Sequence, residues 1–177
     1  MRVELIFYIT LISSILILIK NSSTLKKMIN FILTGFYIGK IKYAPGTFGT
    51  LLAIPIYLLL FQYDTLLKII FLLILFSLSL YLLQYSYAKK FFKNIDDGSI
   101  VIDEIIGFLC FMIFFDYNFY TLVLGFILFR IFDILKPYPI SLIDTKMKNP
   151  LGVLLDDIVA GVFSGVILFI IIHVFSR

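Results

Sequence analysis

The sequence predicts an all-α fold, a polytopic bundle of transmembrane helices with about six apolar segments. Hydrophobic residues make up 62% of the 177-residue chain and charged residues only 15%, whereas a soluble domain is about half apolar. The apolar residues are grouped into runs close to the length that a helix needs to cross a bilayer, about 17 to 25 residues. Composition and run length therefore agree on a protein embedded in a membrane.

Six apolar runs follow one another along the chain, and each is interpreted as one helix. They cover residues 3–19, 48–63, 66–88, 99–115, 119–135 and 154–175. No small-residue cleavage site follows the first run, so we interpret it as a retained helix and not as a signal peptide. The run 48–63 is short and contains Pro55, which leaves both a full span and a re-entrant element open. Residues 28–38 are too short to span and are expected at the membrane interface or against the bundle.

The basic residues predict the orientation of this bundle. Eleven of the 15 basic residues fall in alternate connections between the runs, three fall on the other side, and Arg130 lies within a run. The eleven are Lys20, Lys26, Lys27, Lys40, Lys42, Lys89, Lys90, Lys93, Lys136, Lys146 and Lys148. Because lysines accumulate in cytoplasmic loops, we expect this side to face the cytoplasm and both termini to face outward. The basic residues suit anionic lipid and do not suggest a nucleic-acid partner.

Eight of the 11 acidic residues fall at or near the predicted cytoplasmic ends of the helices. They are Asp96, Asp97, Asp103, Glu104, Asp133, Asp144, Asp156 and Asp157. Asp103 and Glu104 lie inside the apolar stretch GSIVIDEIIGFLCFMIFF. Each acid alone has an ordinary explanation, since it can face water, pair with a lysine or favour a helix N-terminus. Eight acids from several segments at one membrane face indicate a shared site.

A divalent cation is the expected partner of these carboxylates. A charged side chain in hydrocarbon costs about 2.5 to 3.5 kcal/mol, and neighbouring carboxylates repel one another. Oxygen ligands favour Mg²⁺, Ca²⁺ or Mn²⁺ over Zn²⁺, and neither Cys nor His is close by in the sequence. Because Mg²⁺ is usually shared between one or two carboxylates and a substrate phosphate, the pattern predicts a metal and phosphate site beneath the cytoplasmic headgroups.

Small residues are expected to bring the two acidic pairs together. Gly161 and Gly165 form a GxxxG pair, and Asp157 lies one helical turn before Gly161. Asp103 and Gly107 repeat this spacing of four residues. Glycines on facing helices allow close approach, so we expect the two helices to meet beside the acids.

The loop KIKYAPGTFGT, residues 40–50, is a second candidate for phosphate binding. Lys42 is basic, Pro45 and Gly46 form a turn, and Gly46 and Thr47 offer backbone N–H groups and a hydroxyl to an anion. An ordinary Pro-Gly turn is the alternative interpretation.

Cysteine and histidine chemistry is not expected. Cys110 falls near the middle of a run, and His173 falls at the opposite membrane side. The remaining groups are carboxylates, a metal, Arg130, lysines and hydroxyls, which together can bind a phosphate and hydrolyse it.

Four stretches in order form a specific combination of motifs. They are YAPGTFGT followed by Ile54 and Pro55, DDGSIVIDEIIG at 96–107, GFILFRIFDILKPYPISLID at 125–144, and GVLLDDIVAG at 152–161. Together they resemble the phosphatidylglycerophosphatase A family of bacterial membrane lipid phosphatases, over roughly residues 35–172. Residues 1–25 are interpreted as an additional N-terminal transmembrane helix, and residues 26–177 as the membrane domain of this family.

The resemblance implies Mg²⁺-dependent hydrolysis of phosphatidylglycerophosphate to phosphatidylglycerol and phosphate. The enzyme would be a multi-pass protein of the bacterial inner membrane with its active site facing the cytoplasm. The oligomeric state is left open, as is the choice between a water molecule and a carboxylate as the nucleophile.

The acidic pattern and the resemblance together assign roles to individual residues. The expected metal ligands are Asp103, Glu104, Asp156 and Asp157. Arg130 and Lys136 would hold the phosphate, and Asp133 would orient Arg130. The full set of expected catalytic residues is Asp103, Glu104, Arg130, Asp133, Lys136, Asp156 and Asp157. The expected substrate contacts are Lys42, Pro45, Gly46, Thr47, Arg130, Lys136 and Asp144.

Two other functions remain open. A CDP-alcohol phosphotransferase also places acids and a divalent metal at helix ends, although its DG-then-AR pattern is absent, since Asp97 and Gly98 precede SIVIDE. A carboxylate-lined cation transporter would bind a cation through the same acids without hydrolysis. The transporter predicts acids near the bilayer midplane, whereas the phosphatase predicts them at one end.

Overall fold

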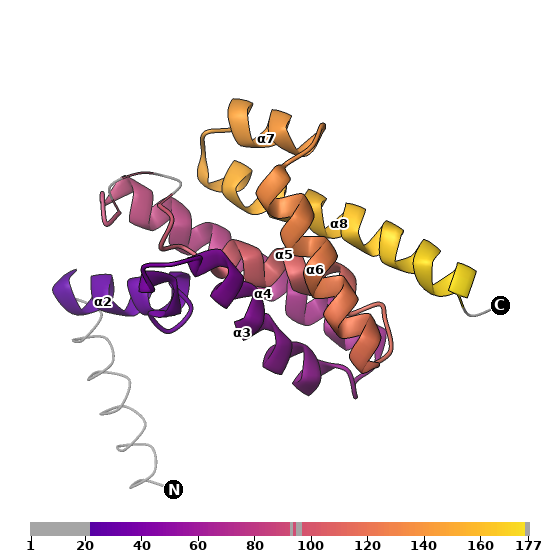
Figure 1. The fold of residues 1–177 in the computed structure, drawn as a ribbon. Coiled ribbons are helices and arrows are strands. Elements are labelled where there is room, and N and C mark those ends of the chain that lie inside the picture. Colours follow the sequence, from indigo (N-terminus) through magenta and orange to yellow (C-terminus); the bar gives the residue numbers. More distant parts are fainter. Residues whose placement is uncertain (1–21, 93, 95–96, 176–177) are drawn as a thin grey trace, which may run out of the picture.

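The computed structural model describes residues 22–92, 94 and 97–175, and all of their regular structure is helical (Figure 1). The elements are α2 (Ser22–Leu33), the 3₁₀ turn η1 (Ile38–Lys40), α3 (Pro45–Leu60), α4 (Thr65–Ala88), α5 (Ile102–Met112), α6 (Phe119–Leu135), α7 (Ile140–Lys146) and α8 (Pro150–Phe175). The all-α prediction is confirmed for these residues. The predicted helix at 3–19 lies outside them, so the additional N-terminal helix stays a prediction.

Helix α5 lies at the centre of the bundle and contacts α3, α4, α6 and α8 (Figure 1). It is buried on nearly every side, and the side chains of Phe108, Leu109 and Met112 are completely inaccessible. Burying a large apolar side chain contributes about 1.5 to 3 kcal/mol. The apolar character of this segment therefore serves the protein core, whatever surrounds the bundle.

The number of spans predicted from the sequence is wrong by the criterion of helix length. In the described part of the chain, two helices are long and apolar enough to cross a membrane, Thr65–Ala88 and Pro150–Val174. Helix α3 has 16 residues, α5 has 11 and α6 has 17. At 1.5 Å per residue, α5 reaches only about 17 Å, which is short of a hydrocarbon core of about 30 Å. The apolar run 99–115 was mistaken for a span because a fully buried core helix has the same composition.

Several helices begin or end at the same end of the bundle. Residues at the starts of α3, α5 and α8 line a common cavity with residues at the ends of α4 and α6. Helix α7 packs on α8 at this end. We call it the cavity end. At the opposite end, the hydroxyl of Tyr57 on α3 donates a 3.0 Å hydrogen bond to the carbonyl of Phe115, which follows α5.

Helix α2 has one face against the bundle and one face exposed. Ile29 and Leu33 are buried, whereas Met28, Phe31 and Ile32 are exposed, and α2 contacts α4. The expectation that residues 28–38 are too short to span and lie against the bundle agrees with this arrangement.

Candidate active site

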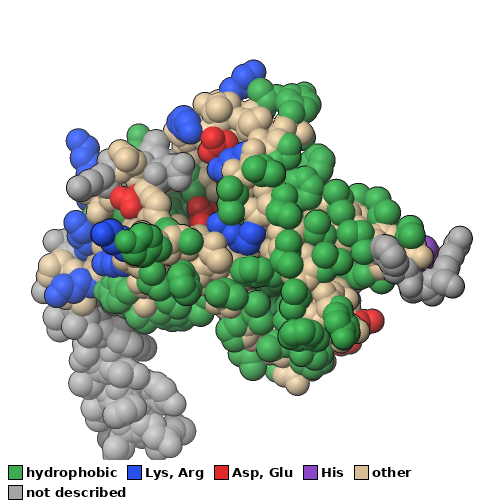
Figure 2. Space-filling model, viewed as in Figure 1, with side chains coloured by type: hydrophobic (Ala, Val, Ile, Leu, Met, Phe, Trp, Pro, Cys, Tyr) green, Lys and Arg blue, Asp and Glu red, His purple; other side chains and the backbone are tan. Residues whose placement is uncertain are grey.

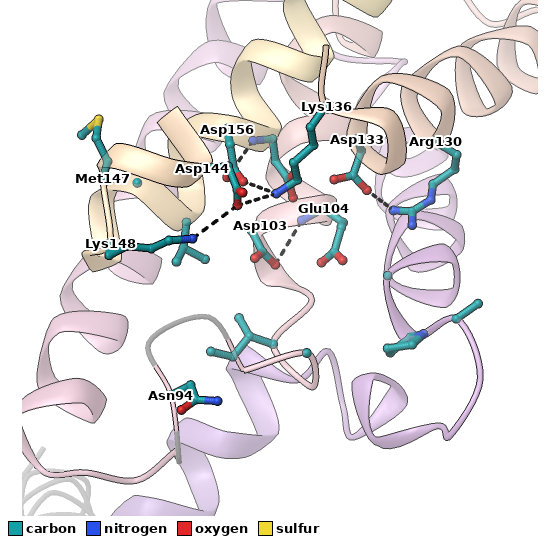
Figure 3. A pocket seen from close by; sticks show the side chains of 18 of the residues that line it. Asn94, Asp103, Glu104, Arg130, Asp133, Lys136, Asp144, Met147, Lys148 and Asp156 are labelled. Carbon is teal, nitrogen blue, oxygen red and sulfur yellow. Dashed lines mark hydrogen bonds and ion pairs between the residues drawn. The ribbon is translucent and has the colours of Figure 1, made fainter. Parts of the chain in front are cut away.

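A polar cavity of about 630 Å³ opens at the cavity end (Figure 3). Its lining residues come from loops and helices far apart in the sequence. They are Ala44, Pro45, Gly46, Tyr87, Asn94, Gly98, Ile100, Asp103, Glu104, Arg130, Asp133, Lys136, Asp144, Met147, Lys148, Gly152, Val153, Asp156 and Asp157. On the face drawn in Figure 2, acidic and basic side chains gather around this hollow, while hydrophobic side chains cover much of the rest. Of the eight acids predicted to share one end, six line this cavity, Asp97 does not, and Asp96 lies outside the described residues.

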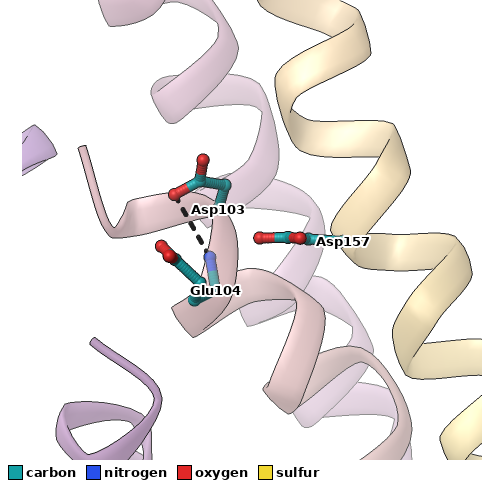
Figure 4. A group of neighbouring side chains, drawn as sticks. All are labelled: Asp103, Glu104 and Asp157. Carbon is teal, nitrogen blue, oxygen red and sulfur yellow. Dashed lines mark hydrogen bonds between the residues drawn. The ribbon is translucent and has the colours of Figure 1, made fainter. Parts of the chain in front are cut away.

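Three carboxylates form the innermost group of the cavity, which we call the acidic triad: Asp103, Glu104 and Asp157. One oxygen atom from each lies within 4.8 Å of the other two. Figure 4 shows Asp157 reaching from α8 toward α5, where Asp103 and Glu104 lie beside each other. Asp103 is 8% exposed and Asp157 is 4% exposed, so water screens their mutual repulsion poorly.

Two glycines let the acidic triad form. A Cβ atom added to Gly107 of α5 would lie 2.7 Å from the backbone carbonyl oxygen of Asp157 on α8. A Cβ atom added to Gly161 of α8 would overlap the carbonyl oxygen of Gly107. The two helices thus cross with backbone against backbone, one turn from Asp103 and Asp157. The predicted role of these small residues is confirmed.

The acidic triad fits a divalent cation. Oδ1 of Asp103 accepts the backbone N–H of Glu104 at 3.2 Å. Oε2 of Glu104 is buried and has no hydrogen-bond partner among the described residues. A buried carboxylate oxygen without a partner is costly, and a hard cation bound to all three carboxylates would remove both this cost and the repulsion. Asp103, Glu104 and Asp157 are the residues that could hold it.

Arg130 lies beside the acidic triad and is held in place by two elements. Its Nη1 atom forms an ion pair with Asp133, one turn later on α6, and donates a 3.3 Å hydrogen bond to the hydroxyl of Thr50 on α3. A Cβ atom added to Gly46 would lie 3.2 Å from Nη1 and would overlap the carboxylate of Glu104. The absence of a side chain at Gly46 therefore leaves room for both charged groups. The predicted pairing of Asp133 with Arg130 is present.

Lys136 links two acids on the other side of the cavity. Its ammonium group forms an ion pair with Asp156 and another with Asp144, the latter at 3.0 Å. Burial alone would lower the pKa of Lys136, but the hydrogen bonds to Asp156 and Asp144 and the charges of Asp156 and Asp157 outweigh burial and raise this pKa above its ordinary value. Lys136 is therefore a permanent positive charge in the cavity.

Asp156 does not join the acidic triad. It was predicted as a fourth metal ligand with Asp157, but its carboxylate pairs with Lys136. Consecutive residues of a helix project about 100° apart. Asp157 therefore faces α5, while Asp156 faces Lys136, the residue that follows α6. Asp144, predicted to contact the substrate, lines the cavity and also forms a 3.9 Å ion pair with Lys148.

The predicted phosphate-binding loop reaches the cavity only in part. Pro45 and Gly46 line the cavity, whereas Lys42 and Thr47 do not. Lys42 is exposed, with its Nζ atom 5.6 Å from the ring centre of Tyr43. The backbone N–H of Thr47 donates to the carbonyl of Ala44 at 3.0 Å. Helix α3 begins at Pro45, so the loop presents a helix start to the cavity, but not the lysine.

Four further residues of the site did not stand out in the sequence. Thr50 lies four residues after Gly46, and this spacing, visible in the sequence, places both residues on one face of a helix. Lys148 lies four residues after Asp144 but beyond α7, which ends at Lys146, so helical spacing does not predict its position. Tyr87 and Asn94 line the cavity because α4 and the loop after it return to this end, which no local pattern reveals.

Comparison with known proteins agrees with this geometry. Residues 31–172 match the family model described as phosphatidylglycerophosphatase A. The chain is 35% identical over 145 residues to phosphatidylglycerophosphatase A of Haemophilus influenzae, covering 81% of this chain and 88% of that protein. It is 37% identical over 140 residues to phosphatidylglycerophosphatase A of Escherichia coli, covering 78% and 80%. It is also 30% identical over 145 residues to a putative phosphatidylinositol-3-phosphatase of Bacteroides thetaiotaomicron, covering 76% and 87%.

The helical fold, its carboxylate-lined cavity and these relatives define the class of protein as a phosphatase. No solved structure matches the chain. The chain belongs to the phosphatidylglycerophosphatase A family, since the family model covers most of its length. The resemblance seen in the four sequence motifs is thereby confirmed.

Proposed function

We propose that the protein hydrolyses phosphatidylglycerophosphate to phosphatidylglycerol and inorganic phosphate with the help of Mg²⁺. The observation that carries this proposal is the acidic triad beside Arg130 in one cavity of a chain from this family. The two relatives of highest identity given above carry the name of this activity. The reaction would serve phospholipid biosynthesis.

Each charged group of the cavity has a place in such a reaction. Asp103, Glu104 and Asp157 would hold a Mg²⁺ ion, which would supply positive charge and Lewis acidity for the phosphoryl group. Arg130 donates hydrogen bonds to those oxygens, and Asp133 and Thr50 keep its guanidinium aimed at them.

Bond changes in the reaction are few. The phosphorus–oxygen bond to the glycerol breaks, a bond to the oxygen of water replaces it, and the glycerol oxygen takes up a proton. A raised pKa makes Lys136 a poor proton donor, so its contribution is electrostatic. Lys136 would stabilise negative charge in the transition state while keeping its own proton.

We place the protein in the bacterial inner membrane with its cavity at the cytoplasmic face. Of the most apolar 18-residue stretch of α4, only 17% is buried within the protein. The corresponding share for α8 is 33%. A core helix of a soluble protein would be mostly buried, so these apolar side chains suit contact with lipid. Lys136 and Lys148 line the cavity, and the positive-inside rule favours the cytoplasm for lysine-rich connections.

The alternatives receive less support from the structure. The acidic triad lies at one end of the bundle, whereas a cation transporter would need carboxylates along a path through it. The three relatives described above are named as phosphatases and not as phosphotransferases.

Phosphate release in detergent micelles tests this proposal. Wild type is compared with Asp103→Asn and Asp157→Asn, each with Mg²⁺ and with a chelator. We expect wild type to release phosphate from phosphatidylglycerophosphate only with Mg²⁺. Both variants should lose about 100-fold or more, since several kcal/mol of transition-state stabilisation depend on the ion.

A control variant separates the site from general effects. Asp64→Asn changes an exposed acid at the start of α4, at the opposite end of the bundle, and should retain wild-type activity. Calorimetric titration with Mg²⁺ alone should show binding to wild type and none to Asp157→Asn. Near-wild-type activity of the triad variants would overturn the site, and an inactive wild type would overturn the substrate.

A further inference from the structure

We propose that Lys148 binds the phosphodiester group of the lipid substrate and so selects substrates that carry a second phosphate. The inference rests on the proposed function, because phosphatidylglycerophosphate bears a terminal monoester and an internal diester phosphate separated by a glycerol. The cavity is far larger than a single phosphate requires, and its cations lie in two separate places, Arg130 in one and Lys136 and Lys148 in the other.

Arg130 belongs to the deep group. Its side chain is 14% exposed and lies beside Glu104 and Gly46. A phosphate at the acidic triad would meet this guanidinium directly. The reacting monoester phosphate therefore belongs at the Arg130 side.

Lys148 belongs to a second group that leads from the interior to the mouth of the cavity. Alternating charges connect Asp156 to Lys136, Lys136 to Asp144 and Asp144 to Lys148. Side-chain exposure rises along this row, from 7% for Asp156 to 27% for Lys136 and Asp144 and 60% for Lys148. Figure 3 shows Lys148 on one side of Asp103 and Glu104 and Arg130 on the other.

Lys148 retains capacity to bind an anion. Lys136 already serves two carboxylates, whereas Lys148 is 3.9 Å from Asp144, beyond the range of a normal hydrogen bond. An ammonium group has three donors. An ammonium group at the mouth, with donors to spare, matches a second anionic group on a substrate whose monoester phosphate lies at the acidic triad.

The surroundings of Lys148 suit the part of the lipid next to the diester. Met147, Ile100 and Val153 also line the cavity and offer apolar surface. The glycerol between the two phosphates would cross the cavity from the Arg130 side to the Lys148 side. A lipid with one phosphate cannot reach both cations.

Inhibition by the two halves of the product tests the assignment. Phosphatidylglycerol carries the diester alone, and inorganic phosphate carries the group released from the monoester. Both are added to phosphatidylglycerophosphate hydrolysis in micelles of constant surface composition, with wild type, Lys148→Gln, Lys148→Arg and Lys146→Gln. Lys146 is an exposed neighbour that does not line the cavity and serves as the matched control.

Lys148→Gln should raise the inhibition constant of phosphatidylglycerol about tenfold, as loss of one charge-assisted hydrogen bond predicts. The constant for inorganic phosphate should change less than about twofold, and KM should rise more than kcat falls. Lys148→Arg should restore most of the phosphatidylglycerol binding, and Lys146→Gln should match wild type.

Equal rises for both inhibitors would overturn the proposal, because Lys148 would then act through Asp144 on the shared site. No rise for either would overturn it as well. A wild-type protein that releases no phosphate from phosphatidylglycerophosphate would refute the proposed function itself, and that result needs no variant.

Discussion

At the scale of single residues, the site depends on side chains that position the reacting groups. Thr50 is completely buried, and its hydroxyl both donates to the carbonyl of Gly46 at 2.9 Å and accepts from Arg130. It therefore fixes the guanidinium of Arg130 to the start of α3.

Replacing Thr50 with valine should lower kcat/KM about three- to tenfold, because Arg130 loses a hydrogen bond worth about 1 kcal/mol. Thr50→Ser keeps the hydroxyl and should retain activity. Steady-state kinetics give kcat/KM of the two variants, and thermal unfolding checks that both are folded. A loss with Thr50→Ser as large as that with Thr50→Val would contradict the prediction, because the serine variant keeps the hydroxyl that accepts from Arg130.

Lys136 allows a prediction about pH. Its pKa is raised by Asp156 and Asp144 above its ordinary value of 10.5, so its charge is present below that value and is lost only as pH rises through the raised pKa. Between pH 6 and 9 the charge is constant. The ratio of wild-type to Lys136→Gln activity should therefore stay constant within about twofold over this range. A ratio that falls toward one at pH 9 would show that Lys136 titrates in this range.

At the scale of helices, the sequence predicted where the helices lie along the chain better than it predicted what surrounds them. The predicted segment 119–135 coincides with α6, and 66–88 differs from α4 by one residue at its start. The segment 99–115 is longer than α5 at both ends. Its apolar flanks continue the core beyond the helix, and hydrophobicity alone does not mark where hydrogen bonding of the helix stops.

The crossing of α5 and α8 should be sensitive to one methyl group. Gly107→Ala would gain about 1 kcal/mol in helix propensity, but its Cβ would lie 2.7 to 2.9 Å from backbone atoms of Asp157. Overpacking costs about 1 to 3 kcal/mol, and backbone cannot move aside as a flexible side chain can. We therefore expect a lower melting temperature for Gly107→Ala in detergent. Gly98→Ala has open space around the new methyl group and should melt as wild type does.

At the scale of the whole molecule, the sequence located the site but not its internal partners. Segregation of charge along the chain predicted that acids from separate segments share one end, and Asp103, Asp133, Asp144, Asp156 and Asp157 do line one cavity. Which acid pairs with a cation and which joins the acidic triad depends on the rotation of each helix about its axis. Composition carries no information on that rotation, so the sequence did not predict that Asp156 pairs with Lys136.

Placement of the cavity end in the cytoplasm can be tested by cysteine labelling. The single native cysteine, Cys110, is first replaced by alanine, and phosphatase activity is checked. Lys146→Cys then reports on the cavity end and Tyr63→Cys on the opposite end, since both positions are exposed. In intact bacterial cells whose outer membrane has been permeabilised, a membrane-impermeant maleimide should modify Tyr63→Cys alone.

Lys146→Cys should react only after the inner membrane is opened, because the lysine-rich connections favour the cytoplasm. The reverse pattern would place the cavity outside, where a lipid phosphate of the inner leaflet could not reach it. Modification of both positions in intact cells would mean that the two ends of the bundle are not separated by a membrane. In that case the exposed apolar faces of α4 and α8 would require another partner.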